Sequence, residues 1–350
     1  MPATPFLRVD GARLWRNVER TAARAAAAGV ALRPHVKTHK SPDIARMQLA
    51  AGAVGITVAT IGEAEVFADQ GCDDIVIAYP LWVDDAAAVR LRDVARRARL
   101  AIGVDSVEGA GRAGLLLGDT DVEALVEVDS GHHRSGVAAG DAGTVAAAAQ
   151  RAGLSVRGVF TFPGHSYAPG GPSRAAADEA RALREAADSL QAAGIEPLVV
   201  SGGSTPSLAH TDTDVVTELR PGVYVFGDAQ QWELGAMEPE DIALTCRSTV
   251  ISHAGGRLVL DAGSKSLGAD RAEYSSGFGR LLDHPDARLV LLSEHHAVAD
   301  LGGARLLPLG SQVDVVPNHV CNAVNLSDTL HVEESGNLWA WTVAARGRNS

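Results

Sequence analysis

The stretch ALRPHVKTHKSPDIA, residues 31–45, contains the change from strand to helix on which the interpretation of the fold depends. Its apolar start is typical of a buried strand, whereas Ser41 and Pro42 suit the N-cap and the first position of a helix. Lys37 therefore falls where a strand ends and the connection to a helix begins. Active sites of α/β proteins collect at that edge, so Lys37 is either an ordinary surface lysine or one held there for chemistry.

Similar apolar runs recur along the first two-thirds of the chain and alternate with alanine-rich stretches of helical spacing. Glycines at positions where helices should end separate several of these segments. Eight strands divided mostly by helices predict a (β/α)8 barrel, with an open doubly wound sheet as the alternative. The strand-like runs are 31–37, 53–60, 73–80, 99–105, 124–129, 156–162, 196–202 and 222–228.

After about residue 230 the pattern changes to alternating strand-like runs punctuated by Gly, Pro and Asn, such as TCRSTVISH (245–253) and LWAWTVAA (338–345). Helical periodicity largely disappears there. We expect residues 15–229 to form the α/β barrel, and residues 230–350, joined by residues 1–14, to form a mostly antiparallel β domain.

The bulk composition restricts the class of protein. The chain has 350 residues, of which 46% are hydrophobic and 21% charged, with a formal net charge of −12. That charge argues against nucleic acid or an anionic membrane as a main partner. Three scattered cysteines are too few for a disulfide framework, and we find neither a signal peptide nor an apolar run of membrane-spanning length. We expect a globular protein of the reducing cytoplasm that acts on a small molecule.

Polar residues gather after the predicted barrel strands, on the face that such loops share. The Gly-Ser-Thr loop SGGSTPS, residues 201–207, has small residues that let backbone N–H groups approach a phosphate. Alone, such a loop is an ordinary turn, and a lone lysine is usually solvated. Together they suggest a phosphorylated cofactor whose aldehyde is held by Lys37, as in a Schiff base to pyridoxal phosphate (PLP). The other polar residues at this face are His39, His132, His133, Arg134, His165, Tyr167 and Arg220.

A second group of candidate residues lies in VVPNHVCNAVNL, residues 315–326. In an extended strand, residues i and i+2 point to the same face, so His319 and Cys321 can offer a nitrogen and a thiolate to one zinc ion. Two protein ligands leave positions open for water and substrate, which suits a catalytic metal. A buried His and Cys in a strand is the alternative. The segment SEHH, residues 293–296, can supply another ligand or a partner for one, or be a polar loop.

Six motifs in this order resemble the D-serine dehydratase/D-threonine aldolase family, which are fold-type III PLP enzymes related to alanine racemase. The resemblance runs from about residue 30 to residue 328. It implies a (β/α)8 barrel with a β domain, and usually a homodimer in which each active site lies near the partner's β domain. The motifs are RPHVKTHK, VEVDSGHHRSGV, SGGSTPS, ELRPGVYVFGD, DAGSKSLG and VPNHVCNAVNL.

The resemblance also implies roles for the barrel residues. Lys37 would be the Schiff-base lysine and the base at Cα, and Arg134 would contact the phenolic oxygen of the cofactor. Arg220 matches the position where alanine racemases place an arginine against the pyridine nitrogen. Tyr167 would lie against the ring, with His165 nearby, and both are candidate catalytic residues beside Lys37. The phosphate would be held by Gly202, Gly203, Ser204, Thr205, Gly222 and Val223.

The metal motif separates the reactions of this family. Its lyases use a metal to bind the β-hydroxyl of the substrate, whereas alanine racemases lack the motif and use a tyrosine of the partner subunit as second base. The dehydratases resemble this chain in having H-x-C, and the aldolases tend towards H-x-D. We therefore expect a dehydratase that converts D-serine, D-threonine or D-3-hydroxyaspartate to a keto acid and ammonia. Zinc is the expected metal, with cobalt, nickel or manganese as alternatives.

Three alternatives to the dehydratase follow from the same resemblance. The first is retro-aldol cleavage of a D-threonine aldolase type, to glycine and an aldehyde. The second is an amino-acid racemase. The third is a PLP-binding protein without substantial catalysis, but relatives of that kind are single barrels without a β domain or a metal pair.

Overall fold

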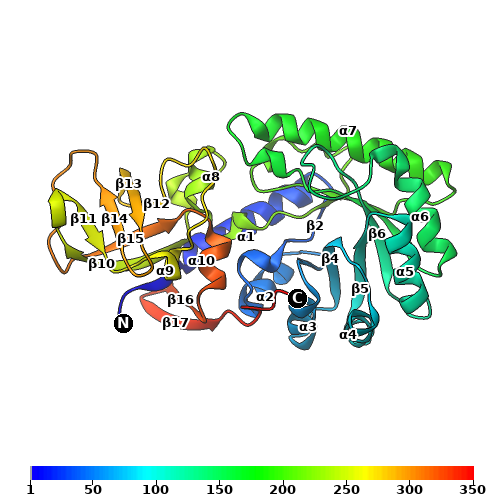
Figure 1. Ribbon diagram of the computed structural model, residues 1–350, viewed down its shortest axis with the longest axis horizontal. Coiled ribbons are helices and arrows are strands. Elements are labelled where there is room, and N and C mark those ends of the chain that lie inside the picture. The colour runs from blue at the N-terminus through cyan, green and yellow to red at the C-terminus, as the bar shows by residue number, and fades with distance from the viewer. Residues whose placement is uncertain (1) are drawn as a thin grey trace. The chain divides into compact units, whose positions relative to one another are not determined.

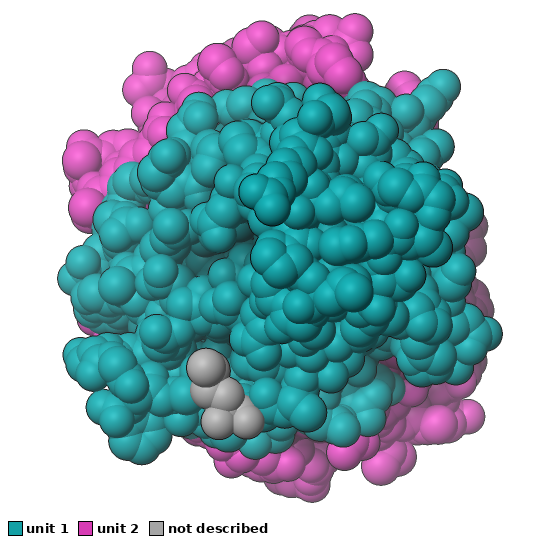
Figure 2. Space-filling model, turned by 90° about the vertical axis from the view of Figure 1, so that its left-hand side faces the viewer, with its two compact units in different colours: residues 1–20, 38–47, 223–347 teal, residues 21–37, 48–222, 348–350 magenta. Residues whose placement is uncertain are grey.

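A computed structural model describes residues 2–350, which divide into two compact units (Figures 1 and 2). The β unit comprises the N-terminal residues up to 20, residues 38–47 and residues 223–347, and the barrel unit comprises residues 21–37, 48–222 and 348–350. The sequence-based division into residues 15–229 and 230–350 stays a prediction, because compactness alone does not define an independently folding domain.

The barrel unit is built on a sheet of eight parallel strands, which confirms the predicted (β/α)8 architecture. The spatial order is β2-β9-β8-β7-β6-β5-β4-β3. A parallel bridge between His35 and Thr57 links the two ends of this order and completes the ring. The strands are β2 (Ala31–Leu32), β3 (Ile56–Val58), β4 (Asp74–Pro80), β5 (Arg99–Val104), β6 (Glu123–Glu127), β7 (Ser155–Phe160), β8 (Val199–Gly202) and β9 (Glu218–Leu219).

One predicted strand was wrong. The run 222–228 does not form the eighth strand, because it folds as the 3-10 turn η5 (Val223–Val225) and leads into a short helix. The eighth strand is instead β9, directly before Arg220, and it is only two residues long. The four consecutive apolar residues at 223–226 are all buried, so this apolar run reflected burial and not extended backbone.

Helices cover the outside of the barrel strands, and three of them begin with conventional N-caps. Thr60, Asp84 and Ser106 each accept a hydrogen bond from a backbone N–H in the first turn of the helix that follows. The predicted helix start at Pro42 is confirmed. The helices are α1 (Gly11–Ala27), α2 (Pro42–Ala50), α3 (Ile61–Asp69), α4 (Asp85–Ala95), α5 (Val107–Leu117), α6 (Ala142–Arg151) and α7 (Gly171–Ala192), with 3-10 turns η1 (Val36–Thr38), η2 (Ala139–Asp141), η3 (Gly164–Ser166) and η4 (Leu208–His210).

The β unit holds a nine-stranded sheet in the order β11-β14-β13-β12-β15-β10-β1-β16-β17. Most pairs are antiparallel, and the N-terminal strand β1 pairs antiparallel with β10 and parallel with β16. The strands are β1 (Phe6–Asp10), β10 (Leu244–Ser252), β11 (Leu258–Leu260), β12 (Gly279–Leu281), β13 (His284–Leu292), β14 (Ala297–Asp300), β15 (Gln312–Pro317), β16 (Thr329–Glu334) and β17 (Asn337–Thr342).

Short helices complete the β unit. They are α8 (Ala229–Glu233), α9 (Ser264–Leu267) and α10 (Val320–Asn325), with 3-10 turns η6 (Pro239–Asp241) and η7 (Ala254–Gly256). In the whole described chain, from residue 2 onward, no helix combines the length and apolar character needed to cross a bilayer.

Candidate active site

Lys37 lies in the turn η1 between β2 and α2, as the sequence predicts. The side chain is half-buried, and its Nζ lies 5.6 Å from the centroid of the Phe162 ring. Phe162 follows β7, which is not a neighbour of β2 in the ring of strands. The lysine therefore extends across the mouth of the barrel. His39, by contrast, is buried and accepts a hydrogen bond from the Ser41 N–H through its Nδ1 at 3.1 Å.

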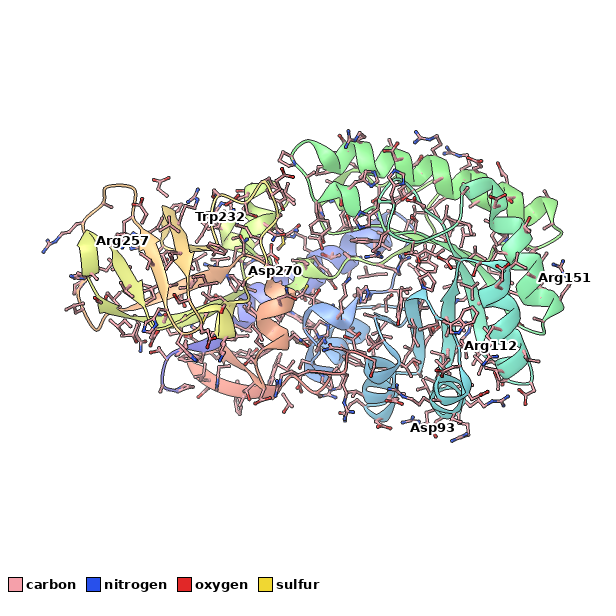
Figure 3. The ribbon with its side chains drawn as sticks, in the orientation of Figure 1. Asp93, Arg112, Arg151, Trp232, Arg257 and Asp270 are labelled. Atoms are coloured by element: carbon pink, nitrogen blue, oxygen red, sulfur yellow. The ribbon has the colours of Figure 1, made fainter. Side chains whose placement is uncertain are left out.

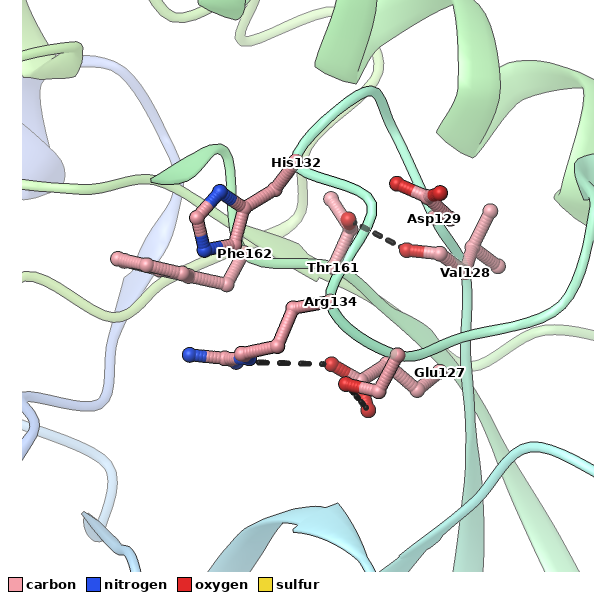
Figure 4. A pocket seen from close by; sticks show the side chains of 8 residues that line it. Glu127, Val128, Asp129, His132, Arg134, Thr161 and Phe162 are labelled. Atoms are coloured by element: carbon pink, nitrogen blue, oxygen red, sulfur yellow. Dashed lines mark hydrogen bonds and ion pairs between the residues drawn. The ribbon is translucent and has the colours of Figure 1, made fainter. Parts of the chain in front are cut away.

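Arg134 lies against the same aromatic ring (Figure 4). Its guanidinium carbon is 5.3 Å from the centroid of Phe162, and one of its terminal nitrogens is 3.9 Å from the carboxylate of Glu127. The ring of His132 meets Phe162 edge to face, at 5.7 Å between centroids. The cationic groups of Lys37 and Arg134 thus both lie over the ring of Phe162. Attraction between each cation and the π-system helps to fix both side chains.

A cavity of about 630 Å³ opens beside these residues in the barrel unit. It lies over the ends of β2 to β6 and is lined by His35, Lys37, Tyr79, Asp105, Arg134 and Asn349, among others. This volume is in the range of small-molecule and cofactor sites. The structure thus brings Lys37 and Arg134 to one cavity.

His35 is an ionisable group of this cavity that the sequence analysis did not single out. Burial lowers its pKa well below the usual value, and the positive charges of Lys37 and Arg220 lower it further. The imidazole is therefore neutral at physiological pH, and it adds no third cation beside Lys37 and Arg134.

Arg220 is buried at the end of β9 and is held by two acceptors. Its guanidinium donates to the Ser201 hydroxyl and to the Thr161 carbonyl, each at 2.6 Å. The Ser201 hydroxyl in turn donates to Glu218 at 2.7 Å, and Glu218 accepts from Arg33 at 2.6 Å. Burial lowers the pKa of Arg220, although an arginine stays charged in proteins.

One nitrogen of the Arg220 guanidinium has no acceptor. Its Nε is buried and has no hydrogen-bond acceptor within the part of the chain that the structure describes. A buried cationic N–H without an acceptor is costly, so an acceptor atom of a bound molecule would satisfy it. The pyridine nitrogen of PLP is such an acceptor, and this observation shows that the residues present fit the cofactor.

The Gly-Ser-Thr loop after β8 is anchored from inside. The Gly203 N–H donates to Glu179 on α7 at 2.6 Å, and the Ser204 N–H donates to the Ser207 hydroxyl at 3.0 Å. The Ser204 hydroxyl also lies 2.8 Å from the Ser166 hydroxyl. Two of the backbone donors expected to face a phosphate therefore have protein acceptors, and the rotatable hydroxyls are the more adaptable groups for an anion.

Glu179 is a second buried group that the sequence analysis missed. Burial raises its pKa to about 7, against the opposing effects of the Gly203 N–H and of Arg220. Its second oxygen, Oε2, is buried and has no hydrogen-bond partner among the described residues. Glu179 thus fixes the backbone of the loop while it holds a proton near neutral pH.

Tyr167 and His165 both lie near the turn η3, as expected, at the same mouth. The Tyr167 ring is 6.2 Å from that of Phe162, centroid to centroid. His165 places its Nε2 at 3.3 Å from Asp178, and its buried Nδ1 has no partner in the described chain. Their predicted roles toward the cofactor stay predictions.

In the β unit, His319 and Cys321 do not lie in a strand, so that sequence-based prediction was wrong. Strand β15 ends at Pro317, His319 is the N-cap of α10, and Cys321 lies in the first turn of that helix. The tight turn still brings the two side chains into hydrogen-bonding contact. Cys321 Sγ also lies 3.4 Å from the Thr38 hydroxyl.

Asp270, which is labelled in Figure 3, is a partner of His319 that the sequence analysis did not identify. Its carboxylate contacts His319 Nδ1. Burial lowers the pKa of His319, but Cys321 and the hydrogen bond to Asp270 raise it overall to about 11. A carboxylate on one imidazole nitrogen orients the other nitrogen for a metal, as in many metal sites.

A metal ion fits the chemistry of this pair. Imidazole and thiolate are ligands for zinc and for related divalent ions, and binding of such an ion would displace protons from His319 and Cys321. Within residues 2–350, no group of three or more His, Cys, Asp or Glu side chains is arranged to hold a metal ion. In the SEHH segment, Glu294 pairs with Lys265 at 2.9 Å.

Comparison with known proteins gives matches along nearly the whole chain. The model of the alanine racemase N-terminal domain matches residues 9–230, and that of a putative serine dehydratase domain matches residues 243–333. D-threo-3-hydroxyaspartate dehydratase of Delftia sp. (strain HT23) is 38% identical, over 91% of this chain and 90% of the relative. D-threonine aldolase of Arthrobacter sp. is 32% identical, over 98% and 93%.

A solved structure of similar fold is a cysteine-to-alanine variant of D-threo-3-hydroxyaspartate dehydratase in the metal-free form. It has a TM-score of 0.89 and 33% identity, and the match covers 98% of this chain and 97% of that one. The likeness therefore extends over both compact units.

Proposed function

Since this chain belongs to the family of fold-type III PLP enzymes built from an alanine racemase N-terminal domain and a serine dehydratase domain, we propose that it is a metal-dependent lyase of D-3-hydroxy amino acids. The preferred reaction is dehydration to a keto acid and ammonia. The observation that carries the proposal is the contact between His319 and Cys321, because a metal there separates the lyases from the racemases of the family.

The barrel unit supplies the residues that would hold PLP. Arg220 Nε would bind the pyridine nitrogen, and Arg134 would contact the phenolic oxygen. Ser204 and Thr205, with Gly202 and Gly203, would hold the phosphate. PLP, when bound, stabilises negative charge that develops on the substrate Cα. Gly222 is proposed to complete the phosphate contacts, and Tyr167 and His165 are proposed to lie beside the ring as further candidate catalytic residues.

Lys37 would link to PLP and would then move the substrate proton. As a free amine, its Nζ would take the proton from Cα. This step needs Lys37 as the neutral amine. Because Arg220 stays charged, it would leave the pyridine nitrogen unprotonated, which limits the build-up of negative charge on the cofactor.

The β unit supplies the residues that would hold the metal. His319 would bind through the nitrogen that faces away from Asp270, and Cys321 would bind as the thiolate. A divalent ion there polarises an oxygen as a Lewis acid, which assists departure of a β-hydroxyl. Zinc fits the nitrogen and sulfur donors best, with cobalt or nickel as alternatives and manganese as a less natural one. The metal-free cysteine variant of the related dehydratase supports a cysteine ligand.

The second candidate reaction is retro-aldol cleavage, favoured by the similarity to D-threonine aldolase. There the same residues would promote loss of a proton from the β-hydroxyl instead of loss of the hydroxyl. The greater identity to the dehydratase and the presence of Cys321 favour dehydration. A homodimer and a cytoplasmic location stay predictions from the resemblance and the composition.

The test is to incubate the PLP-loaded protein with D-threonine or D-threo-3-hydroxyaspartate, with and without zinc, and to identify the products by mass spectrometry. Dehydration yields 2-oxobutanoate or oxaloacetate with ammonia, whereas an aldolase yields glycine and an aldehyde. His319→Ala and Cys321→Ala should each lower metal binding and turnover, and Cys72→Ala in the barrel unit is the matched cysteine control. Turnover that is indifferent to metal and to both substitutions would refute the metal-dependent lyase.

A further inference from the structure

The guanidinium of Arg220 is fixed by three contacts inside the barrel unit. Its two terminal nitrogens donate to the Ser201 hydroxyl and to the Thr161 carbonyl, each at 2.6 Å. Its central carbon lies 5.1 Å from the centroid of the Phe160 ring, so the cation also has a π-contact. These contacts hold the group whose Nε has no acceptor among the described residues.

The two acceptors belong to neighbouring strands, so the sheet sets the distance between them. Ser201 lies in β8, and Thr161 directly follows β7. Phe160 pairs with Ser201 in the parallel register, and the Thr161 N–H donates to the Ser201 carbonyl at 3.0 Å. Arg220 is therefore held by residues at the ends of two paired strands.

Ser201 connects Arg220 to a buried chain of charged groups. Its hydroxyl donates to one oxygen of Glu218 at 2.7 Å, and the other oxygen of Glu218 accepts from Arg33 at 2.6 Å. Arg33 also donates to Asp74 at 2.8 Å. The exposed fractions of Ser201, Glu218 and Arg33 are 0%, 3% and 1%, so these hydrogen bonds form where water screens charge little.

The hydroxyl between the carboxylate and the guanidinium has one arrangement of its proton. Serine has a single O–H, which goes to Glu218, and its lone pairs are left to accept from Arg220. Hydrogen bonds in such a chain polarise one another, so the charge of Glu218 strengthens the bond between Ser201 and Arg220. Both acceptors that bind Arg220 directly are nevertheless uncharged.

The electrostatics of Arg220 agree with this connection. Burial lowers the pKa of Arg220, and the charge of Glu218 is the largest of the effects that raise it. Glu218 thus stabilises the cation through the Ser201 hydroxyl. The guanidinium is kept charged and in place, while its Nε stays open to an acceptor atom of a bound molecule.

We propose that Ser201 is a positioning residue for the cofactor, which transmits the charge of Glu218 to Arg220 and fixes the guanidinium for contact with the pyridine nitrogen. The inference rests on the proposed function and deepens it, because it assigns recognition of the cofactor ring to a buried chain of hydrogen bonds instead of to Arg220 alone. Ser201 itself would not touch the cofactor.

The test compares two cofactors that differ at the pyridine nitrogen. In the 1-deaza analogue of PLP a C–H group replaces this nitrogen, so the analogue keeps the aldehyde and the phosphate but offers Arg220 no acceptor. Binding of each to the full-length protein, freed of cofactor, is measured by isothermal titration calorimetry. Wild type should prefer PLP by about tenfold or more, as expected for a hydrogen bond to a charged group.

Ser201→Ala should reduce this preference at least severalfold, because PLP binding weakens while binding of the analogue does not. Ser201→Thr keeps the hydroxyl and should restore the preference. Ser189→Ala is the matched control, since it removes a hydroxyl of α7 that donates to the Gly140 carbonyl at 2.7 Å. Equal losses for both cofactors would mean a merely structural role, and they would overturn the proposal, as would an unchanged preference.

A second variant tests the same chain without removing the hydroxyl, in case Ser201→Ala does not fold. Glu218→Gln removes the charge at the far side of Ser201, while Arg33 keeps its ion pair with Asp74 at 2.8 Å. The preference for PLP over the analogue should fall in this variant too. A folded Glu218→Gln protein with the preference of the wild type would overturn the transmission of charge through Ser201.

The levels of inference fail in different ways. A wild-type protein that binds no PLP would remove the proposed function itself. Equal affinity of the wild type for PLP and the analogue would remove the contact of Arg220 with the pyridine nitrogen, and with it the role of Ser201. A wild-type preference that persists in Ser201→Ala would remove only the role of Ser201.

Discussion

The barrel unit and the β unit place their chemical groups by different rules. In the barrel unit, Lys37, Arg134 and Arg220 each follow a parallel strand, and they share one end of the ring. In the β unit, His319 and Cys321 lie on the turn into a short helix, after a strand that belongs to a largely antiparallel sheet.

The difference shows where a sequence pattern locates a site and where it does not. Parallel strands all run the same way, so the residue after each strand lies at one known edge. Antiparallel strands end at alternate edges, so strand order alone does not say which loops meet. In the β unit the approach of His319 and Cys321 depended on local backbone conformation, and that conformation was helical and not extended.

The largest effect should follow from Lys37→Ala. This variant tests the inference that residues after the parallel strands share one edge of the barrel and form its site. We expect loss of PLP fixed by borohydride reduction and a fall in turnover of about 10²- to 10⁴-fold, because the same amine would anchor the cofactor and move the proton. Peptide mass spectrometry locates the fixed cofactor. Lys40→Ala is the control, since Lys40 Nζ donates to Asn325 at 2.8 Å. PLP attached at another lysine would contradict the assignment of Lys37 as the residue that binds the cofactor in the barrel unit.

A second effect should come from Glu179→Gln, beneath the Gly-Ser-Thr loop. Since the folded state raises the pKa of Glu179 from 4.5 to about 7, the native protein holds this proton more tightly than the unfolded chain. Its contribution to stability is therefore present below pH 4.5 and is lost as the pH rises to about 7, a change of roughly 3 kcal/mol. Glutamine keeps the acceptor for the Gly203 N–H and should remove this loss.

Urea unfolding of both proteins at several pH values gives the measurement. The difference in unfolding free energy between wild type and Glu179→Gln should shift in favour of the variant as the pH rises through this window. Glu185→Gln, at an exposed position of the same helix α7, is the matched control. A difference that does not change with pH would contradict the buried proton, and with it the internal anchoring of the loop.

A smaller effect is expected for Asp270→Asn. This variant tests whether the proposed metal residues of the β unit depend on a partner that is distant in the sequence. The substitution keeps the shape but weakens the orientation of His319, so metal affinity should fall about 10- to 100-fold. Metal titration monitored by calorimetry measures this. Asp283→Asn in the same unit serves as control. Unchanged affinity would mean that the turn alone, without its acidic partner, positions the imidazole.

The smallest effect is expected for Ser106→Ala, at the N-cap of α5. The Ser106 hydroxyl accepts a hydrogen bond from the Gly109 N–H at 3.1 Å, and loss of such a cap costs about 1 kcal/mol. Denaturant unfolding should show this loss with metal affinity unchanged.

His319 is also an N-cap, but its side chain makes no capping hydrogen bond, so His319→Ala should affect metal binding and not the stability of α10. Loss of helix α10 in the His319→Ala variant would contradict this prediction, because it would mean that the His319 side chain stabilises the helix as Ser106 does in α5.

The signals for some of the missed residues were present in the sequence. Glu179 lies on the buried stripe of α7, between Ala176 and Leu183, so helical spacing placed a carboxyl on an apolar face. His35 lies two residues before Lys37, in the same motif. Asp270 follows the DAGSKSLG motif by two residues, but nothing local linked it to His319, 49 positions later.

By itself, the sequence determined the barrel, the strand-to-helix edge that carries Lys37, and the pairing of His319 with Cys321 in a motif. These follow from periodicity, capping residues and short spacings, which act between near neighbours in the chain. Only the tertiary structure decided that β9 replaces the run 222–228, that α10 begins at the metal motif, and that Asn349 lines the Lys37 cavity. The physical reason is that burial and hydrogen bonding between distant segments override local preference, and their partners cannot be read from spacing alone.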